Sequence, residues 1–411
     1  MMNPYLFLPL TIFLSISFLF TKAQDIDQKS VTIPFILDHN RMLVDAEMQK
    51  KDGTWQKVKL WVDCGNPTLS LSEPLARDLG MDLSATDNVS EKPASIGVAT
   101  PAIRIGGMKL DAQETKTKVM FQPFWLFSTM HNDANLPSTI LKKYHVVFDY
   151  PNRQLTIAEP GSIQPIGIPS LATINPDNGI IQLDASIDNT KLSFALDNGA
   201  SYCFISEDKL SFLKDKNPSW PTMTGTAGCA NMWGWWPAGE QDFQVVRVPN
   251  FLWGKEVLQN VGLVGVPKFS PEGPTLGEWY SRKTVNPVDG FLGANALKNY
   301  RVEIDYSHSK VYFWKGSETG NKDMDIVGIS VGQLADGSYQ VVGIVKKDGK
   351  PVVEGISPGD ILTSIGEMNV KGKTMGTVVN ALRGIPGDIR ILQLEREGKQ
   401  LRVETKVTNM L

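Results

Sequence analysis

Cysteine and histidine are scarce in this sequence, which has 3 Cys and 4 His among 411 residues. Three cysteines are too few for the disulfide framework of a small stapled fold. The histidines have no metal-ligand spacing among themselves or with the cysteines. They are His39, His131, His145 and His308. We therefore expect neither a bound metal nor another cofactor.

No excess of either charge is present, because 41 Lys and Arg residues stand against 44 Asp and Glu residues, for a formal net charge of −3. A nucleic-acid partner usually requires a basic surface, so we expect none. Hydrophobic residues make up 42% of the chain and charged residues 21%, which excludes wholesale disorder. The length allows two or three domains.

Only one long apolar run occurs, near the N-terminus. Residues Tyr5–Phe20 carry no charge, and the small residue Ala23 follows soon after. This pattern predicts a secretory signal peptide at residues 1–23. The alternative is an uncleaved anchor helix, for which the run is short. The protein is thus expected to be exported, either to the periplasm or cell envelope or as a secreted protein, with no stable membrane span after signal removal.

The rest of the chain divides into three parts. Residues 24–158 (the first part) and 171–314 (the second part) both contain short runs of alternating apolar and polar residues between Gly, Pro, Asn and Asp. Such runs are typical of strands and hairpins. Residues 159–170 and 315–323 are rich in turn formers and are expected to be a connector and a linker. Residues 324–411 form the C-terminal part.

The first two parts repeat each other. Leu141–Tyr150 aligns without gaps to Leu297–Tyr306, with six of ten positions identical. Earlier in each part an apolar strand ends in Asp-x-Gly, as Asp63-Cys64-Gly65 and as Asp197-Asn198-Gly199. The repeat predicts two homologous β lobes that pair within one chain, in place of a homodimer. Each lobe offers one aspartate on a tight turn.

Two such aspartates permit a specific chemistry. A Gly-containing turn at a strand end holds a carboxylate rigidly and lets a partner approach closely. Two carboxyls brought together cannot both ionise, so the pair shares a proton. One then acts as general base on a water while the other polarises a carbonyl as an acid.

Both parts resemble the lobes of retropepsin- and pepsin-like aspartic proteases. The second part matches better, with Asp197-Asn198-Gly199-Ala200-Ser201, then Phe291-Leu292-Gly293, then Leu297–Tyr306. The resemblance implies a mainly β pseudo-dimer in which Asp63 and Asp197 are the catalytic pair. It places five further residues in the active-site loops: Cys64, Gly65, Asn198, Gly199 and Ser201.

The sequence departs from this family pattern in four places, one of which is Asn66-Pro67, where the family has a pair of small residues. The family has Thr or Ser between Asp and Gly, and that hydroxyl bonds to the opposite loop. Cys64 is a poor donor at this position, whereas Asn198 can donate and accept. Ser138-Thr139-Ile140 is expected to be the counterpart of Phe291–Gly293 and lacks its Gly. Cys64 is also considered as a nucleophile, but it has no visible His partner.

The second part contains an insertion. The Asp-x-Gly turns are offset by 134 residues and the later matched segments by 156, so 22 extra residues lie between them. Gly228 and Cys229 stand where such a lobe places a flap-like hairpin. Six of the ten Trp fall between Trp220 and Trp279, either as an aromatic wall beside a cleft or as packing of the insertion. The sequence leaves open whether Cys203 and Cys229 form a disulfide.

The C-terminal part resembles a PDZ domain of the bacterial periplasmic type. The resemblance rests on Glu354–Leu362, which contains a Pro-Gly-Asp turn, on a helix pattern at Thr374–Leu382 and on a strand at Ile389–Arg396. A PDZ domain adds an extended peptide to its sheet edge. The resemblance implies that a short apolar segment receives the peptide's C-terminal carboxylate, namely Ile326, Val327, Gly328 and Ile329.

The sequence therefore predicts two mainly β lobes followed by a small α/β PDZ-like domain. The first hypothesis is an exported aspartic endopeptidase that acts on a peptide or protein through Asp63 and Asp197, with a PDZ domain for peptide binding or regulation. The alternative is a non-catalytic protease-like scaffold that binds peptides or protein C-termini. The unusual Cys64, Asn66 and Asn198 and the missing Gly of the first part support this alternative.

Overall fold

A computed structural model describes residues 28–83, 98–120, 125–225, 243–316 and 322–411. The protein is mainly β, with short helices between the strands. Among the described residues, no helix is both long and apolar enough to span a membrane. The apolar run Tyr5–Phe20 and the expected flap residues Gly228 and Cys229 lie outside the described residues.

The first part forms an eight-stranded sheet in the order β7-β6-β3-β4-β9-β5-β8, with β2 paired to β3. Apolar residues alternate along these strands and supply a buried core. The strands are β2 (Ile36–Asp38), β3 (Arg41–Gln49), β4 (Trp55–Asp63), β5 (Leu69–Ser72), β6 (Ile103–Ile105), β7 (Met108–Leu110), β8 (Thr117–Met120) and β9 (Ala134–Pro137). The helices are α1 (Glu73–Asp78), α2 (Trp125–Met130) and α3 (Ser138–Leu141).

The second part forms most of a ten-stranded sheet in the order β13-β14-β15-β20-β16-β19-β18-β17-β26-β27. Its strands are β13 (Thr173–Ile174), β14 (Ile181–Ile187), β15 (Thr190–Leu196), β16 (Cys203–Ser206), β17 (Thr222–Thr224), β18 (Gln244–Trp253), β19 (Glu256–Val266) and β20 (Gly290–Leu292). Strands β26 (Lys346–Lys347) and β27 (Lys350–Pro351) come from the C-terminal part. The helices are α4 (Glu207–Lys216), α5 (Leu276–Tyr280) and α6 (Ala294–Leu297), and the 3₁₀ helix η2 is Ser281–Lys283.

Parallel pairing supports both Asp-x-Gly turns from behind. Strand β4 pairs with β9 so that Val62 lies opposite Leu136, and β15 pairs with β20 so that Leu196 lies opposite Leu292. Leu136 is therefore the counterpart of Leu292, and Pro137 occupies the position of Gly293.

This register corrects one sequence-based prediction. Ser138-Thr139-Ile140 is not the counterpart of Phe291–Gly293, because these residues already belong to α3, which corresponds to α6 in the second part. The equivalent strand is Asn135-Leu136-Pro137. Sequence comparison missed it because Pro137 stands where the second part has Gly293. Gly293 leaves no room for a side chain, since a Cβ there would lie 2.0 Å from the Tyr202 carbonyl oxygen. The contact that requires this glycine is made within the second part.

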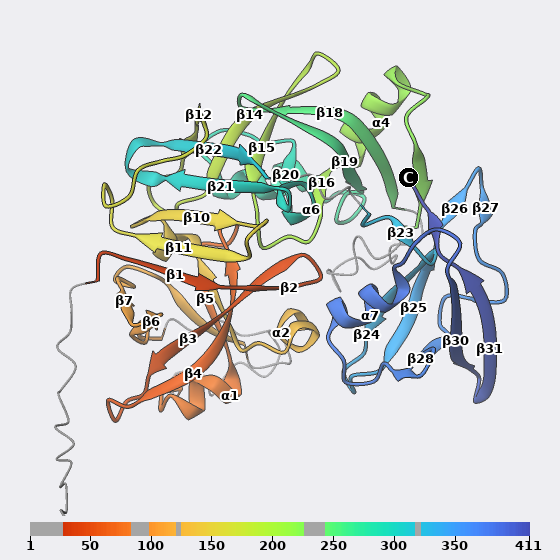
Figure 1. Cartoon of the computed structure of the whole chain (residues 1–411), viewed down its shortest axis with the longest axis horizontal. Helices are drawn as coiled ribbons and strands as arrows, with labels where there is room; N and C mark the ends of the chain where they lie inside the picture. Colours follow the sequence, from red (N-terminus) through yellow and green to blue (C-terminus); the bar gives the residue numbers. More distant parts are fainter. Residues whose placement is uncertain (1–27, 84–97, 121–124, 226–242, 317–321) are drawn as a thin grey trace, which may run out of the picture.

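A third sheet joins the two parts across a near-twofold axis. Its order is β1-β11-β10-β21-β22-β12, and Val147 of β10 lies opposite Glu303 of β21 at its centre. Figure 1 shows it between the orange strands of the first part and the upper strands of the second. The strands are β1 (Ser30–Pro34), β10 (His145–Asp149), β11 (Gln154–Ala158), β12 (Ile168–Leu171), β21 (Tyr300–Asp305) and β22 (Lys310–Lys315). Because β12 begins at Ile168, the connector is shorter than the predicted 159–170.

The C-terminal part contains a six-stranded sheet and one helix, drawn in blue in Figure 1. The sheet order is β24-β25-β28-β30-β31, with β29 paired to β28, and β23 pairs separately with β32. The strands are β23 (Asp325–Ile326), β24 (Ile329–Gln333), β25 (Tyr339–Ile344), β28 (Ile361–Ile365), β29 (Met368–Asn369), β30 (Ile389–Arg396), β31 (Lys399–Lys406) and β32 (Thr408–Asn409). The helix α7 is Met375–Leu382.

The C-terminal part is built into the rest of the protein. Thr224 of β17 pairs with Lys346 of β26, so the second part's sheet continues into this region. The Asp38 carboxylate accepts a hydrogen bond from Gly376 N at the start of α7, at 2.9 Å. One apolar cluster contains buried residues of both regions, for example Phe204 and Val341. Removing residues 324–411 would therefore uncover a shared core.

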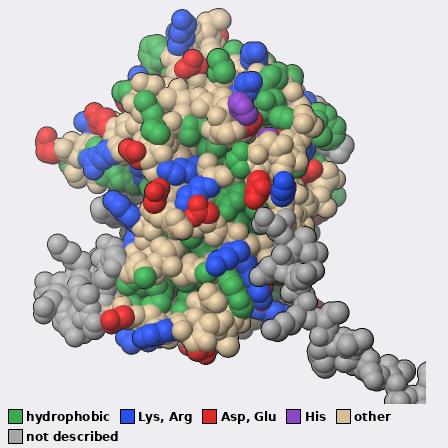
Figure 2. All heavy atoms as spheres, turned by 90° about the vertical axis from the view of Figure 1, so that its left-hand side faces the viewer, with side chains coloured by type: hydrophobic (Ala, Val, Ile, Leu, Met, Phe, Trp, Pro, Cys, Tyr) green, Lys and Arg blue, Asp and Glu red, His purple; other side chains and the backbone are tan. Residues whose placement is uncertain are grey.

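The surface shows no single-sign patch on the face drawn in Figure 2, where basic and acidic side chains lie interspersed. This face is the left-hand side of Figure 1, which carries β1 and the neighbouring strands. The mixture agrees with the near-balance of 41 Lys and Arg against 44 Asp and Glu residues.

Candidate active site

The two Asp-x-Gly turns face each other across the near-twofold axis. A Cβ placed on Gly65 would lie 2.1 Å from Asp197 Cγ, and a Cβ placed on Gly199 would lie 2.3 Å from Asp63 Oδ1. Each glycine therefore packs directly against the carboxyl of the opposite turn. Any side chain at either position would separate the carboxyls, so glycine is required by close approach and not by a positive φ.

The two carboxyls lie close enough together to raise the pKa of Asp63. Gly65 N donates to Asp63 Oδ1 at 3.0 Å, and Ala200 N donates to Asp197 Oδ1 at 3.1 Å. Asp63 is 4% exposed and Asp197 is 8% exposed. Two buried carboxyls this close together retain a shared proton, which is the state that acid-base work requires.

Burial raises the pKa of both carboxyls. Burial and the Asp197 carboxylate raise the pKa of Asp63 well above its ordinary value. Burial also raises the pKa of Asp197. Lys283 acts against the rise at both carboxyls, whereas the Tyr280 hydroxyl acts against it at Asp197 alone. The environment therefore favours the proton on Asp63 and the negative charge on Asp197.

Cys64 and Asn198 connect the two turns. Cys64 N donates to Asn198 Oδ1 at 2.8 Å, and the Cys64 thiol donates to the Leu196 carbonyl oxygen at 3.6 Å. Both side chains thus reach across to the opposite turn. Asn198 supplies the acceptor that a hydroxyl supplies in the family pattern, and Cys64 supplies a weaker donor.

This placement argues against Cys64 as a nucleophile. The thiol is fully buried, and burial raises the pKa of Cys64 well above its ordinary value. A nucleophilic cysteine needs a lowered pKa or an adjacent base. The thiol instead donates to a backbone carbonyl.

Tyr280 is a site residue that sequence reasoning missed. Its hydroxyl donates to Asp197 Oδ2 at 3.0 Å and lies 3.3 Å from the Gly65 carbonyl oxygen. Tyr280 ends the short helix α5, which begins with a capping box between Thr275 and Glu278. The cap fixes the start of the helix and thereby the position of its last residue.

Lys283 is the second missed residue. Its ammonium lies 4.7 Å from the ring centre of Trp279 and 4.8 Å from that of Tyr280. The same nitrogen lies 3.5 Å from the Gly65 carbonyl oxygen. The side chain is half-buried. The only sequence signal for either residue was the extra length of the second part, because both lie in the long connection between β19 and β20.

Ser201 links the second turn to the first part. Arg41 Nε donates to Ser201 Oγ at 3.1 Å, and Asn40 Nδ2 donates to the Ser201 carbonyl oxygen at 3.1 Å. The ring centroids of His39 and Tyr202 lie 5.9 Å apart. The turn between β2 and β3 therefore holds the end of the second active-site loop.

The described cysteine of the candidate disulfide is a free thiol. Cys203 is buried and its thiol donates to Asn295 Oδ1 at 3.0 Å. Gly293 N donates back to Cys203 Sγ at 3.3 Å. Cys203 therefore fastens the strand behind the second turn without a disulfide. Cys229 and Gly228 lie outside the described residues.

Of the clustered tryptophans, the described ones serve packing. Trp253 is fully buried, and its ring centre lies 5.0 Å from that of Phe313. The Trp279 ring packs edge-on against Tyr280, and the Lys283 ammonium lies over it. Three others, Trp233, Trp235 and Trp236, lie outside the described residues.

The segment expected to receive a peptide carboxylate is internal. Val327 N donates to the Leu382 carbonyl oxygen at 3.0 Å, and Ile329 N donates to the Val327 carbonyl oxygen at 2.7 Å. Ile326, Val327 and Ile329 are fully buried. A Cβ on Gly328 would lie 2.2 Å from Val352 Cγ2. The amides of Val327 and Ile329 are therefore already engaged in this structure.

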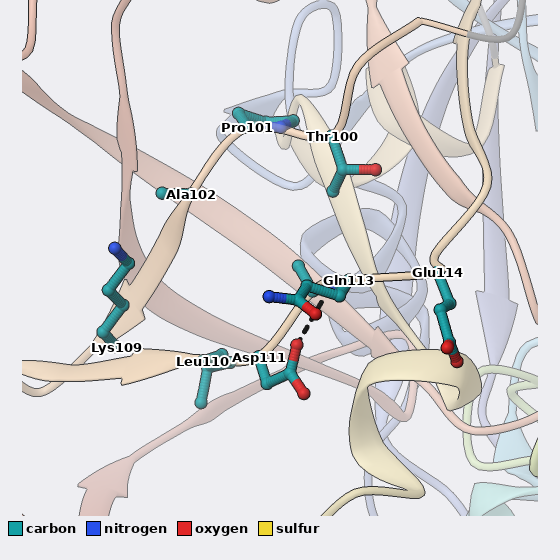
Figure 3. Close-up of a pocket in the computed structure, with 9 residues that line it drawn as sticks. Thr100, Pro101, Ala102, Lys109, Leu110, Asp111, Gln113 and Glu114 are labelled. Atoms are coloured by element: carbon teal, nitrogen blue, oxygen red, sulfur yellow. Dashed lines mark hydrogen bonds between the residues drawn. The ribbon is translucent and has the colours of Figure 1, made fainter.

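A cavity of about 630 Å³ lies elsewhere in the first part. Figure 3 shows it, with Asp111 accepting a hydrogen bond from Gln113 N, which measures 2.9 Å. Its lining consists of residues 100–102 and 109–114 and includes neither Asp63 nor Asp197. The cavity is thus separate from the facing carboxyls. Within the part of the chain that is described, no three or more His, Cys, Asp or Glu side chains are grouped to hold a metal ion.

Comparisons with known proteins give distant similarity to solved structures only. Neither a protein-family model nor a curated protein matches the chain. Among solved structures, the chain is similar to "Crystal structure of aspartic proteinase from Irpex lacteus", at 10% sequence identity and a TM-score of 0.38. The similarity covers 70% of this chain and 98% of that one. A similarity at this level assigns no function, so function has to be argued from the site.

Proposed function

We propose that the protein is an exported aspartic endopeptidase that hydrolyses peptide bonds with Asp63 and Asp197. The observation that carries the proposal is the approach of the two carboxyls across the near-twofold axis, with Gly65 and Gly199 each packed on the opposite carboxyl. Duplicated turns, each behind a buried strand, supply the rigidity that the chemistry needs.

The reaction follows from the charge state of the pair. The ionised carboxylate takes a proton from a water molecule while the protonated carboxyl gives its proton to the scissile carbonyl oxygen. The water oxygen bonds to the carbonyl carbon and gives a neutral tetrahedral diol. When the diol collapses, the C–N bond breaks and the carboxyl that took the proton of water gives it to the leaving amine nitrogen. One diol hydroxyl returns its proton to the other carboxylate, so both carboxyls regain their starting protonation states and no other reactant is consumed.

The C-terminal part is proposed to be a PDZ-like regulatory module. Arg383, just after α7, donates through Nη2 to the Tyr202 hydroxyl at 2.7 Å. Tyr202 immediately follows Ser201 of the second active-site loop. Asp38, near the residues that hold Ser201, binds the start of α7. These contacts favour regulation of the carboxyl pair over independent peptide capture by Ile326–Ile329.

One observation favours a second function, a non-catalytic protease-like scaffold that binds peptides. Both carboxyls are almost covered, with exposures of 4% and 8%, and Tyr280 occupies Asp197 Oδ2. A scaffold would bind peptides without cutting them.

Cleavage of a peptide library from acidic to neutral pH separates the two functions. We expect the wild type to cut peptides and the Asp63→Asn and Asp197→Asn variants to cut none. Asp45→Asn is the matched control, because the Asp45 side chain is 91% exposed. Binding of library peptides without any cleavage by the wild type would support the scaffold instead.

A further inference from the structure

We infer that Tyr280 and Lys283 are positioning residues of the carboxyl pair: Tyr280 keeps the negative charge on Asp197 and the shared proton on Asp63, and Lys283 favours the charged state of the pair. The inference rests on the proposed endopeptidase function and assigns the two roles within it. Asp197 would be the base that activates water, and Asp63 the acid that polarises the carbonyl.

The Tyr280 hydroxyl provides the first contact. It donates to Asp197 Oδ2, whereas Asp197 Oδ1 accepts from Ala200 N. Both oxygens of Asp197 therefore accept a hydrogen bond, which stabilises the ionised form. Asp63 has the corresponding backbone donor, Gly65 N, on its Oδ1. Burial raises the pKa of Tyr280 well above its ordinary value, so the hydroxyl keeps its proton and stays a donor.

The Lys283 ammonium provides the second interaction with the carboxyl pair. It rests over the rings of Trp279 and Tyr280 and beside the Gly65 carbonyl oxygen, which fixes the charge next to the first turn. A cation over aromatic rings is held by their quadrupoles in a partly desolvated place. There it attracts the carboxylate more strongly than in water. Burial lowers the pKa of Lys283, while Asp197 and Asp63 act to raise it.

The two residues lie on consecutive helical turns. Tyr280 ends α5, and Lys283 ends η2, which follows directly. Val288 N donates to Ser281 Oγ at 2.9 Å and Ser281 Oγ donates to the Gly277 carbonyl oxygen at 2.6 Å. These bonds brace the segment against the strand behind Asp197.

Other ionisable groups lie near the carboxyl pair, and none of them is changed in the variants of the test. Arg41 is the second cation, held on Ser201 Oγ, and burial lowers its pKa to about 10. Cys64 and Tyr150 are buried groups whose pKa values are raised by burial, so neither carries charge. Lys118 of β8 acts on Lys283 rather than directly on the carboxyls.

The test is the pH profile of kcat/KM for wild type, Lys283→Met and Tyr280→Phe. Loss of a positive charge or of a donor to the carboxylate raises the pKa of the pair, so both limbs move toward alkaline pH by about one unit. Below both acid midpoints, kcat/KM then falls about tenfold. Lys283→Arg keeps the charge and is expected to restore most of the shift.

Lys268→Met is the matched control, because Lys268 is an exposed lysine in the same connection. Its profile should superimpose on that of the wild type. A Lys283→Met enzyme with lowered activity but unmoved limbs would overturn the inference, since a merely structural role would scale the profile without shifting it.

A second readout does not depend on activity. With aspartate labelled at the carboxyl carbon, the ¹³C titration of the pair is assigned with Asp63→Asn and Asp197→Asn. We expect Asp197 to titrate first, and its midpoint to rise in Lys283→Met. If the wild type cuts no peptide but this shift appears, the proposed function fails while the charge assignment stands. If Asp63 titrates first, or Lys283→Met shifts neither carboxyl, the inference is wrong whatever the activity.

Discussion

Asn198 Oδ1 accepts a hydrogen bond from Cys64 N at 2.8 Å, and this bond joins the two active-site turns across the near-twofold axis. The two residues are 134 positions apart and stand at equivalent places in the repeat. These equivalent places hold an amide in one turn and a thiol in the other. The turns stay connected because the amide oxygen is a strong acceptor.

Asn198→Ala should destabilise the protein. The variant leaves the buried Cys64 N–H without its acceptor, which costs about 1–3 kcal/mol of unfolding free energy. Urea unfolding measures this loss. Asn250→Ala is the control, since Asn250 is exposed on β18 and should be nearly neutral. Equal stability of Asn198→Ala and wild type would show that this bond does not hold the turns.

Asp63→Asn should change how stability depends on pH. Because the pKa of Asp63 is raised in the folded protein, the folded state binds this proton more tightly than the unfolded chain, where Asp titrates near about 3.9. The associated stability is present below that pH and is lost as pH rises through the folded-state pKa. The variant lacks this loss, so the wild type should fall relative to it from about pH 4 upward.

Calorimetric melting temperatures across that range check this. Asp45→Asn should follow the wild-type curve, because its carboxyl is exposed. A wild-type protein that gains stability relative to Asp63→Asn as pH rises would contradict the raised pKa.

The contact between Arg383 and Tyr202 should carry regulation from the C-terminal part. Tyr202→Phe and Arg383→Met each break the same 2.7 Å bond. We expect their effects on kcat/KM to be non-additive, with a coupling of about 0.5–3 kcal/mol in a double-mutant cycle. Additive effects would show that the bond transmits nothing. Point variants are needed because deletion of residues 324–411 would uncover the shared core.

The two aspartates of the candidate site could be predicted from the sequence, but the groups that surround them could not. Asp63 and Asp197 were visible because each stands in a local pattern, an apolar strand before a Gly turn, that occurs twice. Tyr280 was not visible, because its contact with Asp197 spans 83 positions and its own neighbourhood is an unrepeated connection. The sequence pattern of the second part does not show which residue of the long connection between β19 and β20 contacts Asp197.

The strand counterpart of Gly293 could not be predicted because it depends on strand register. Pro137 stands where Gly293 stands in the second part, and only the pairing of Asp63 with Pro137 reveals the equivalence. The helix at Met375–Leu382 was readable because local spacing and its N-cap Thr374 determine it. The engaged amide of Val327 depends on the distant Leu382 carbonyl oxygen, which local sequence does not encode.

The rate of peptide cleavage by wild type and Asp197→Asn, measured on one good substrate between acidic and neutral pH, tests the central claim most directly. The account predicts a bell-shaped kcat/KM profile for the wild type, as expected of two carboxyls that share a proton. It predicts loss of cleavage by a factor of at least about 10³ in the variant, whose neutral amide cannot take a proton from water. Equal rates for the two proteins would contradict it.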